Sequence, residues 1–474
     1  MQKQKSNLDW PQIYRERRNK LRRTMASCVT LWLGQRLQPR NYANNEYYPF
    51  RQGSHFLYYT GLSEPDLGLL SFPESDHDVL FCNPISLDDI VWMGSGHSRV
   101  DMAREAGIDT VEDTARLGKY IKKAKAQGLA IHYLPPYQAS TILQIAELLA
   151  MEPGGVVRKA SQRLMVEVAR QRLIKSEAEI LEIEDALRVT DKMHRAAMAA
   201  ARPGMREYEI LSVIEATAVA HNRRQAFTPI ITIHGEILHN HSYNGVLKEG
   251  QLVVNDSGAE SPRYYASDIT RTFPVSGNFS AQQAEIYQAA LRTQLAAIEM
   301  VKPGIPFRDL HVAACKVLAE SLRDIGLMKG NPADAVAEGA HALFLPHGLG
   351  HCMGLDVHDM EDLGEEIVGY TKGEKRSEQF GMKYLRFTRP LEAGFVITIE
   401  PGIYFIPALI DRWKQERLHR SFINYKKVDE FRGFGGIRIE DDVFVTSNGG
   451  RVLGPGIPKT IPELEEVMGE RRKA

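Results

Sequence analysis

One stretch constrains the possible fold more than any other, namely residues 252–275, LVVNDSGAESPRYYASDITRTFPV. Its two strand-like runs flank a turn at Ser-Pro-Arg, which predicts an antiparallel hairpin. Pairing the strands about Pro262 sets Asp256 directly opposite Asp268, because each lies six positions from that proline. Like charges that face each other in an apolar sheet are destabilising unless a cation lies between them. The hairpin therefore predicts a cation site, unless one aspartate only ends a strand.

Two further carboxylates lie in strand-like runs near the end of the chain. Glu400 is in VITIEPGIYF and Glu440 is in GGIRIEDDVFV. Either glutamate alone could be a solvent-facing charge on an edge strand. Two such strands together with the aspartate hairpin favour a group of carboxylates that share one site.

The stretch HGLGHCMGLDVHD, residues 347–359, adds three histidines. His347 and His351 have the i, i+4 spacing of a helical zinc motif, but no glutamate follows His347. Each of the three glycines would cost a helix about 1 kcal/mol, so the stretch is predicted to be loop or strand. One histidine is expected to be a metal ligand, and the other two to hydrogen-bond a substrate carbonyl or a developing charge. The spacing does not distinguish them, and a structural, hydrogen-bonded histidine is the alternative for each.

The donor set indicates the kind of metal. Four carboxylates and one neutral imidazole carry a formal charge of minus four, which two divalent cations would neutralise. Oxygen-rich ligands with a single nitrogen favour Mn(II), with Co(II) or Zn(II) as possible alternatives. The sequence therefore predicts a dinuclear site of the kind found in two-metal hydrolases.

The organisation of the chain predicts two α/β domains, residues 1–172 and 173–474. The first alternates short apolar runs with polar helical stretches, and CVTLWL, residues 28–33, is expected to be a buried strand and not part of a signal peptide. Ser176 and Glu179 form a capping box that begins a helix of the second domain. Within that domain ARPGM at 201–205 is echoed by VKPGI at 301–305, which suggests two related halves. The charged stretch 361–383 is expected to be a surface insertion.

Composition excludes several classes of partner. The chain has 59 basic and 60 acidic residues, so it lacks the net charge that would attract nucleic acid or an anionic membrane. Its four cysteines have no C-x-x-C spacing and fit reduced thiols, which predicts a cytoplasmic location. No apolar run approaches the length of a membrane span.

Several motifs together resemble the proline-specific peptidases of the pita-bread metallopeptidase family, the Xaa-Pro aminopeptidases and Xaa-Pro dipeptidases. They are PHGLGHCMGLDVHD, ITIEPGIYF, FGGIRIEDD and DSGAE with YASDITRTFPV. YPFRQGSHFLYYTGLSEPD and IVWMGSGHS are similar to the N-terminal domain of that group. The resemblance implies an α/β (α+β) fold, with a small aminopeptidase P-like domain followed by a creatinase-like pita-bread domain with pseudo-twofold halves. It also implies a homodimer or homotetramer.

The resemblance implies a role for each candidate site residue. The implied metal ligands are Asp256, Asp268, His351, Glu400 and Glu440. Asp268 and Glu440 would bridge the ions, and Glu400 would also act as base and then acid. His239 and His358 match the catalytic histidines that support the tetrahedral intermediate. His347 matches the histidine beside the proline pocket, and Arg438 the arginine packed against the site.

The implied activity is hydrolysis of the Xaa-Pro bond in short peptides with proline at the second position. YLRFTRPLEAG resembles the prolidase segment in which an arginine, here Arg386, meets the free carboxylate of a dipeptide. This favours a dipeptidase. The alternative is an aminopeptidase P acting on longer peptides, with Arg386 in a surface ion pair. Trp92 lies where the aminopeptidase P group has a tryptophan near the active site, and it could equally be a core aromatic.

Two other classes are considered. Pita-bread domains also occur as metal-free binding modules, but those relatives lack the ligand set that is complete here. Methionine aminopeptidases share the ligand pattern but normally lack such a large N-terminal domain and the Arg386 region.

Overall fold

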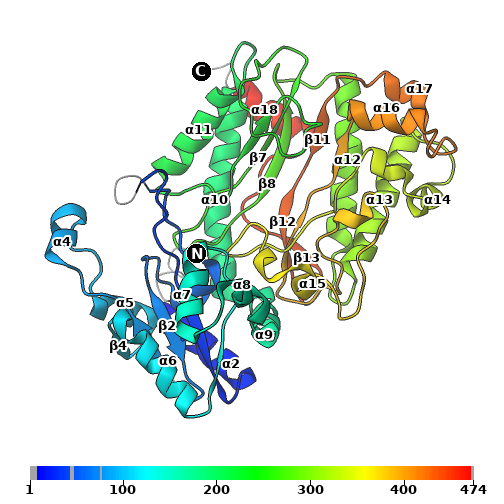
Figure 1. Ribbon diagram of the computed structural model, residues 1–474. Helices are drawn as coiled ribbons and strands as arrows, with labels where there is room; N and C mark the ends of the chain where they lie inside the picture. Colours follow the sequence, from blue (N-terminus) through cyan, green and yellow to red (C-terminus); the bar gives the residue numbers. More distant parts are fainter. Residues whose placement is uncertain (1–7, 43–46, 75–76, 471–474) are drawn as a thin grey trace. The chain divides into compact units, whose positions relative to one another are not determined.

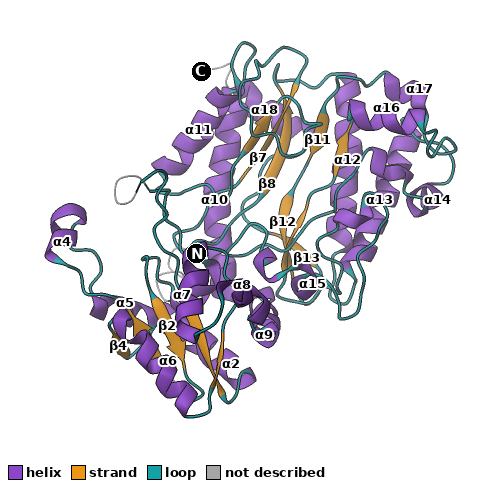
Figure 2. Cartoon of the chain, in the orientation of Figure 1, coloured by secondary structure: helices purple, strands orange, loops and turns teal. Residues whose placement is uncertain are grey.

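The computed structural model describes residues 8–42, 47–74 and 77–470, which form two compact units. The first unit comprises the described residues up to 172 together with 360–367, and the second comprises residues 173–359 together with 368–470. Both combine helices and strands (Figures 1 and 2). None of the described helices is both long enough and apolar enough to cross a membrane.

The first unit is built on a five-stranded sheet of order β4-β3-β2-β1-β5. The strands are β1 (Cys28–Leu33), β2 (Gly68–Ser71), β3 (Asp78–Phe81), β4 (Thr110–Glu112) and β5 (Ala130–His132). β2 pairs antiparallel with β1 and β3, whereas β5 and β4 pair parallel with β1 and β3 respectively. The predicted buried strand at CVTLWL is therefore confirmed as β1.

Helices complete the first unit. They are α2 (Trp10–Thr24), α3 (Ser54–Thr60), α4 (Leu87–Met93), α5 (Arg99–Ala106), α6 (Leu117–Ala126), α7 (Ala139–Leu149), α8 (Pro153–Val156) and α9 (Gln162–Leu173). A hydrophobic cluster lies between the sheet and α6 and α7, and contains Val29, Leu70, Ile121 and Ile145.

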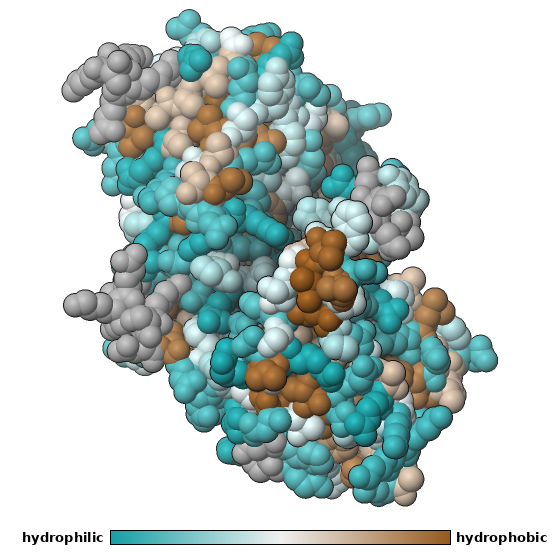
Figure 3. Space-filling view, turned by 90° about the vertical axis from the view of Figure 1, so that its left-hand side faces the viewer, coloured by the Kyte–Doolittle hydropathy of each residue, from teal (hydrophilic) through white to brown (hydrophobic). Residues whose placement is uncertain are grey.

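Helix α4 has no buried residue. Leu87, Val91, Trp92 and Met93 are all exposed, and Trp92 keeps 81% of its surface accessible. Figure 3 shows hydrophobic residues gathered on this face of the molecule. The interpretation of Trp92 as a core aromatic is therefore wrong.

The strands of the second unit form three small sheets. One has the order β6-β7-β8, from β6 (Ile230–Thr232), β7 (Leu252–Ser257) and β8 (Ile269–Pro274). Another has the order β13-β12-β9, from β9 (Val396–Ile399), β12 (Asp441–Val445) and β13 (Gly450–Val452). β10 (Gly402–Tyr404) pairs with β11 (Gly436–Arg438). All of these pairings are antiparallel.

Long helices flank these strands. In Figure 2 the strands lie between α10 (Glu177–Ala200) and α11 (Glu207–Ala220) on one side and α12 (Ala281–Met300) and α13 (Phe307–Asp324) on the other. Shorter helices are α14 (Pro332–Ala337), α15 (Glu365–Val368), α16 (Pro407–Gln415), α17 (Tyr425–Asp429) and α18 (Ile461–Glu470). α10 begins at the predicted capping box, where the backbone N–H of Ser176 donates to Glu179 at 2.9 Å.

The two predicted halves are confirmed by the same arrangement in each. ARPGM ends α10 and precedes α11, and VKPGI ends α12 and precedes α13. In each half the second helix packs on the first. The strands that follow the first helix pair are β6 to β8, and those that follow the second are β9 to β13.

The expectation for residues 361–383 is only partly met. Most of residues 371–378 are exposed, but Leu363, Val368 and Tyr370 are buried. The hydroxyl of Tyr370 donates to the carbonyl of Leu385 at 2.7 Å. The stretch is therefore anchored by buried side chains at its beginning and is not wholly a surface loop.

The hairpin of β7 and β8 has a different register from the predicted one. Asp256 pairs with Thr270, so the hairpin is centred on Arg263 and not on Pro262. The reason is a wider turn, in which the backbone N–H of Ser261 donates to the carbonyl of Tyr265 and Tyr264 has a φ of 68°. A shift of two residues keeps every side chain on the same face of a strand. Asp256 and Asp268 therefore still share a face, but as diagonal neighbours.

Gly258 allows the two chains of this hairpin to approach closely. A Cβ atom at this position would lie 1.8 Å from the carbonyl oxygen of Ser267. We expect Gly258→Ala to lower the free energy of unfolding by about 2 kcal/mol or more, because overpacking of this kind costs roughly 1–3 kcal/mol. Urea unfolding monitored by circular dichroism measures this change.

The matched control is Gly456→Ala, since Gly456 is exposed and a Cβ there has no neighbour within 4 Å. It should change the unfolding free energy by no more than about 0.5 kcal/mol. Equal effects of the two substitutions would contradict the close approach at Gly258.

Candidate metal centre

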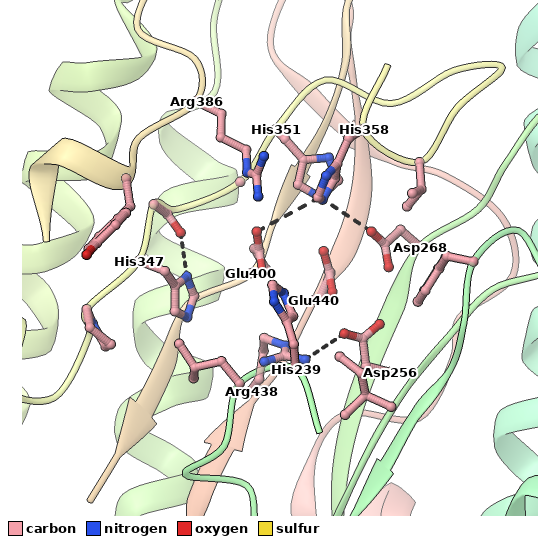
Figure 4. A pocket seen from close by; sticks show the side chains of 18 of the residues that line it. His239, Asp256, Asp268, His347, His351, His358, Arg386, Glu400, Arg438 and Glu440 are labelled. Carbon is pink, nitrogen blue, oxygen red and sulfur yellow. Dashed lines mark hydrogen bonds and ion pairs between the residues drawn. The ribbon is translucent and has the colours of Figure 1, made fainter. Parts of the chain in front are cut away.

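All ten candidate site residues line one cavity of about 840 Å³ in the second unit (Figure 4). They are Asp256, Asp268, His351, Glu400, Glu440, His239, His347, His358, Arg386 and Arg438. The carboxylates come from strands of both halves. Asp256 lies in β7 and Asp268 directly precedes β8, whereas Glu400 directly follows β9 and Glu440 directly precedes β12.

Three of the predicted ligands are especially close. Asp268, His351 and Glu440 each offer one ligand atom, and these atoms all lie within 4.8 Å of one another. His351 Nε2 lies 3.4 Å from Asp268 Oδ2 and 4.0 Å from Glu400 Oε1. The two halves thus meet at this point.

Hydrogen bonds hold His351 in a loop without helical structure, as the glycines predicted. Its backbone N–H donates to Thr398 Oγ1 at 3.1 Å, and the N–H of Thr398 donates to the carbonyl of His351 at 2.9 Å. His351 Nδ1 lies 3.2 Å from the carbonyl of Cys352. This contact leaves Nε2 to face the carboxylates. Gly350 makes the approach possible, because a Cβ there would lie 2.0 Å from the carbonyl of Thr398.

Thr270 and Asp442 orient two of the carboxylate residues. The hydroxyl of Thr270 donates to Glu440 Oε2 at 2.7 Å, and the N–H of Glu440 donates to the carbonyl of Thr270. The backbone N–H of Asp268 donates to Asp442 Oδ2 at 3.1 Å. These contacts place a residue of one half against a strand of the other.

The carboxylates repel one another. Burial raises the pKa of Asp268 well above its usual value, and the charge of Asp256 adds to the effect. Burial, with the charge of Asp268, likewise raises the pKa of Glu440 well above its usual value. Burial also raises the pKa of Glu400. The carboxylates therefore lack sufficient positive charge around them.

Arg438 supplies part of that charge. Its guanidinium donates to Asp256 Oδ2 at 2.6 Å and to Tyr404 Oη at 3.3 Å. Burial alone would lower the pKa of Arg438, but Tyr404 and the surrounding carboxylates hold it well above its usual value. A single guanidinium cannot neutralise four carboxylates.

The donor atoms fit a metal. Among the four candidate carboxylate ligands, three have a buried oxygen without a hydrogen-bond partner in the described part of the chain, namely Asp256 Oδ1, Asp268 Oδ1 and Glu440 Oε1. Buried polar atoms are rarely left unpaired, and an ion is one of the few explanations. Oxygen ligands with one imidazole nitrogen suit hard divalent cations. The centre is therefore chemically suited to bind metal.

The remaining histidines surround the carboxylates. His347 Nδ1 lies 2.7 Å from the carbonyl of Gly348 and Nε2 lies 2.8 Å from Tyr404 Oη. Burial, with the charge of Arg438, lowers the pKa of His347 to about 3. Its imidazole is therefore neutral, with Nδ1 as the donor and Nε2 as the acceptor. His358 packs edge-on against His351, with ring centroids 4.2 Å apart. Burial and then Arg438 lower the pKa of His239.

Arg386 is half-buried and lines the same cavity, where Figure 4 shows it pointing toward Glu400 and His351. Phe380 and Tyr384 belong to the same wall. The end of the 361–383 stretch thus contributes directly to the site, which sequence reasoning did not predict.

Sequence reasoning also missed Tyr404, Thr270 and Asp442. Alternation along a strand could have indicated two of them, because Thr270 lies two positions after Asp268 and Asp442 two after Glu440. Tyr404 gave no such indication, since an aromatic residue in an apolar strand is ordinarily a core residue.

Comparison with known proteins gives the class of protein. Residues 182–447 match metallopeptidase family M24, and residues 14–132 match the aminopeptidase P N-terminal domain. The chain therefore belongs to metallopeptidase family M24 and is a metal-using peptidase.

Its relatives carry two kinds of name. The Xaa-Pro dipeptidase of Homo sapiens is 31% identical over 470 residues, covering 94% of this chain and 90% of the relative. A probable Xaa-Pro aminopeptidase of Fusarium vanettenii is 32% identical over 444 residues, covering 92% of each. A variant of Escherichia coli aminopeptidase P, solved in complex with substrate, is 28% identical with a TM-score of 0.81, covering 98% of this chain and 99% of that one.

Replacing Asp268 tests the metal centre. We expect Asp268→Asn to lower metal affinity by more than about 100-fold and to abolish peptidase activity, since loss of an outer hydrogen-bond partner alone costs 10–100-fold. Metal content measured by mass spectrometry on purified protein is the readout. The control is Asp324→Asn, whose side chain is 57% exposed on α13, and which should keep full metal content. Unchanged metal content in Asp268→Asn would refute the assignment of Asp268 as a ligand.

Proposed function

We propose that this chain is a dinuclear-metal-dependent exopeptidase that hydrolyses the Xaa-Pro bond of short peptides and prefers dipeptides, as a prolidase does. The names of the relatives support the Xaa-Pro specificity, because both the dipeptidase and the aminopeptidases that match most of this chain cleave at that bond by name. The preference for dipeptides rests on Arg386.

The five clustered residues Asp256, Asp268, His351, Glu400 and Glu440 would hold two divalent ions, and Asp268, His351 and Glu440 offer the ligand atoms that lie within 4.8 Å of one another. Their oxygen-rich chemistry favours Mn(II), with Co(II) or Zn(II) as alternatives. A zinc-substituted form of Escherichia coli aminopeptidase P, with a TM-score of 0.80, supports some tolerance of metal identity. Bound divalent ions polarise a peptide carbonyl and lower the pKa of a water molecule.

The other catalytic roles are assigned to individual side chains of the cavity. Glu400 lines the cavity beside His351 and would move a proton to the leaving proline nitrogen. His239 and His358 lie at the same cavity and would donate hydrogen bonds to the oxyanion that develops on the scissile carbonyl. Burial keeps His347 neutral and Tyr404 fixes its ring, so His347 would form a rigid wall beside the proline ring.

Arg386 is the observation that carries the dipeptidase assignment. Its half-buried guanidinium lies in the cavity wall, and a guanidinium binds a carboxylate through two parallel hydrogen bonds. In a dipeptide the free carboxylate directly follows proline, whereas a longer peptide has an amide there. A longer peptide would therefore lack the carboxylate that Arg386 binds, and the dipeptide would bind better.

The second candidate function is that of an aminopeptidase P. The matching N-terminal domain and the similarity to Escherichia coli aminopeptidase P over nearly the whole chain favour it. A metal-free binding module is disfavoured, because buried carboxylates without a cation would destabilise the fold. We further propose a homodimer or homotetramer in the cytoplasm, where the four buried, free cysteines would stay reduced.

Product analysis separates the two activities. Metal-stripped protein is reloaded with manganese and given Ala-Pro and Ala-Pro-Ala in parallel, and free proline and free alanine are followed. We expect proline from the dipeptide with little cleavage of the tripeptide. Efficient release of alanine from the tripeptide would instead establish an aminopeptidase P.

Replacing Arg386 tests its role in substrate choice. Arg386→Ala should lower kcat/KM for Ala-Pro by about 10- to 100-fold, since a hydrogen bond to a charged group contributes about 1.5–3 kcal/mol. Turnover of Ala-Pro-Ala should change much less. The matched control is Arg412→Ala, because Arg412 also lines the cavity but pairs with Glu416 at 3.0 Å. Equal losses of both substrates in Arg386→Ala would show that no carboxylate is bound there.

A further inference from the structure

A second group of metal-ligating side chains lies in the second unit, outside the lining of the catalytic cavity. His311 and Cys315 are one turn apart on α13, and His341 lies in the short 3-10 helix Ala340–Leu343. One nitrogen of each histidine and the sulfur of Cys315 all lie within 4.8 Å of one another. All three residues have no exposed surface, and none of them lines the cavity of Figure 4.

The histidines of this group lack ordinary partners. Neither Nδ1 nor Nε2 of His341 has a hydrogen-bond partner among the described residues. The nitrogens of His311 lie against Cys315 Sγ, at 3.5 Å for Nε2 and 4.0 Å for Nδ1. An unsatisfied buried polar group costs about 1–3 kcal/mol. The two imidazole nitrogens of His341 therefore destabilise the fold unless a ligand binds to them.

The surroundings keep the lone pairs of both histidines available. Burial lowers the pKa of His311 to about 3 and that of His341 to about 4, so both rings are neutral. The ionisable groups that act on them are other histidines, and no carboxylate is among these within the described chain. Burial alone raises the pKa of the Cys315 thiol. The group therefore offers two nitrogens and one sulfur in an apolar environment.

We propose that His311, Cys315 and His341 bind one monovalent copper ion. Two imidazoles and a thiolate form a soft donor set, which selects Cu(I) or Zn(II) over the hard ions suited to the carboxylate centre. Cu(I) with one thiolate is neutral overall, whereas Zn(II) would leave a net positive charge in the apolar core. Zn(II) also requires a fourth ligand in a structural site. On binding, the Cys315 thiol releases its proton to solvent, the sulfur donates an electron pair to the ion, and no oxidation occurs.

The distances are close to those that such a centre needs. Metal–sulfur and metal–nitrogen bonds of about 2.3 and 2.05 Å place sulfur and nitrogen about 3.8 Å apart in a trigonal centre. His311 Nε2 lies 3.5 Å and Nδ1 4.0 Å from Cys315 Sγ, so the sulfur lies beside the ring and the imidazole of His311 must turn on binding to aim a lone pair at the ion. Two metal–nitrogen bonds place the nitrogens about 3.6 Å apart, so from separations that do not exceed 4.8 Å the ligand atoms need to close by roughly 1.2 Å at most.

The site would also steady the catalytic cavity. Phe344 follows the 3-10 helix of His341, and its carbonyl accepts a hydrogen bond from the N–H of Tyr404 at 2.9 Å. Tyr404 in turn contacts His347. A bound ion would fix the segment that leads from His341 to this pair.

Metal content of protein folded in the presence of copper tests the proposal. The three ligands are fully buried, so copper must be present while the chain folds. The wild-type chain is therefore expressed in copper-supplemented cells and purified without oxygen as the holoprotein. Mass spectrometry should find about one copper per chain. Cys315→Ala should lose nearly all of it, and alanine is well tolerated in a helix. The matched control is Cys28→Ala, a buried cysteine of β1, which should keep the copper.

Two further readouts protect the test from a folding defect. Cys315→Ala made in copper-free medium should keep wild-type circular dichroism and peptidase turnover, since Cys315 has no part in the catalytic site. His341→Leu, which keeps Cys315, should also lose the copper.

X-ray absorption at the copper edge should show a monovalent ion with one sulfur and two nitrogen ligands. Copper absent from the wild type, equal copper in Cys315→Ala, or copper with only oxygen and nitrogen ligands would each overturn the proposal. Sulfur-ligated zinc that depends on Cys315 would overturn the assignment of a monovalent ion.

Discussion

The repulsion among the buried carboxylates around Asp268 is the constraint on which the second unit depends. Each half of the unit contributes two of them, Asp256 and Asp268 from one hairpin and Glu400 and Glu440 from the other half. Folding therefore brings like charges together across the contact between the halves, and burial prevents water from screening them. Only a cation or protonation relieves this cost. Metal binding and the association of the halves are thus parts of one equilibrium.

Arg438 connects that charge balance to the substrate side of the cavity. Its guanidinium donates both to Asp256 and to Tyr404, and Tyr404 contacts His347. The chain of contacts runs from a predicted ligand to the residue expected beside proline. A change in charge at Asp256 would alter the position of Arg438 and hence of the Tyr404 hydroxyl. The orientation of Tyr404 and His347 is therefore coupled to the charge of the metal centre.

The sequence predicted this site better than it predicted the local geometry. Side chains alternate between the two faces of a strand, and a register shift of two residues leaves this alternation unchanged. The sequence therefore placed Asp256 and Asp268 correctly on one face. The register itself was wrong, since it depends on the hydrogen bonds of Ser261 and the positive φ of Tyr264, which no hydrophobic pattern encodes. Trp92 was misjudged because a strongly apolar helix reads as buried when its packing partners are unknown.

The candidate metal ligands and the residues proposed to select the substrate lie on different kinds of structure. The carboxylates sit on or directly beside strands whose positions are fixed by cross-strand pairing, so their mutual geometry tolerates little change. Phe380, Tyr384 and Arg386 come instead from a stretch with little regular structure, which can vary without disturbing the strands. Relatives that match almost the whole chain at about 31–32% identity carry both dipeptidase and aminopeptidase names, as is expected if this proposed separation holds. In the proposed enzyme the metal centre would cleave the peptide bond, and the irregular wall would set how much peptide may follow the proline.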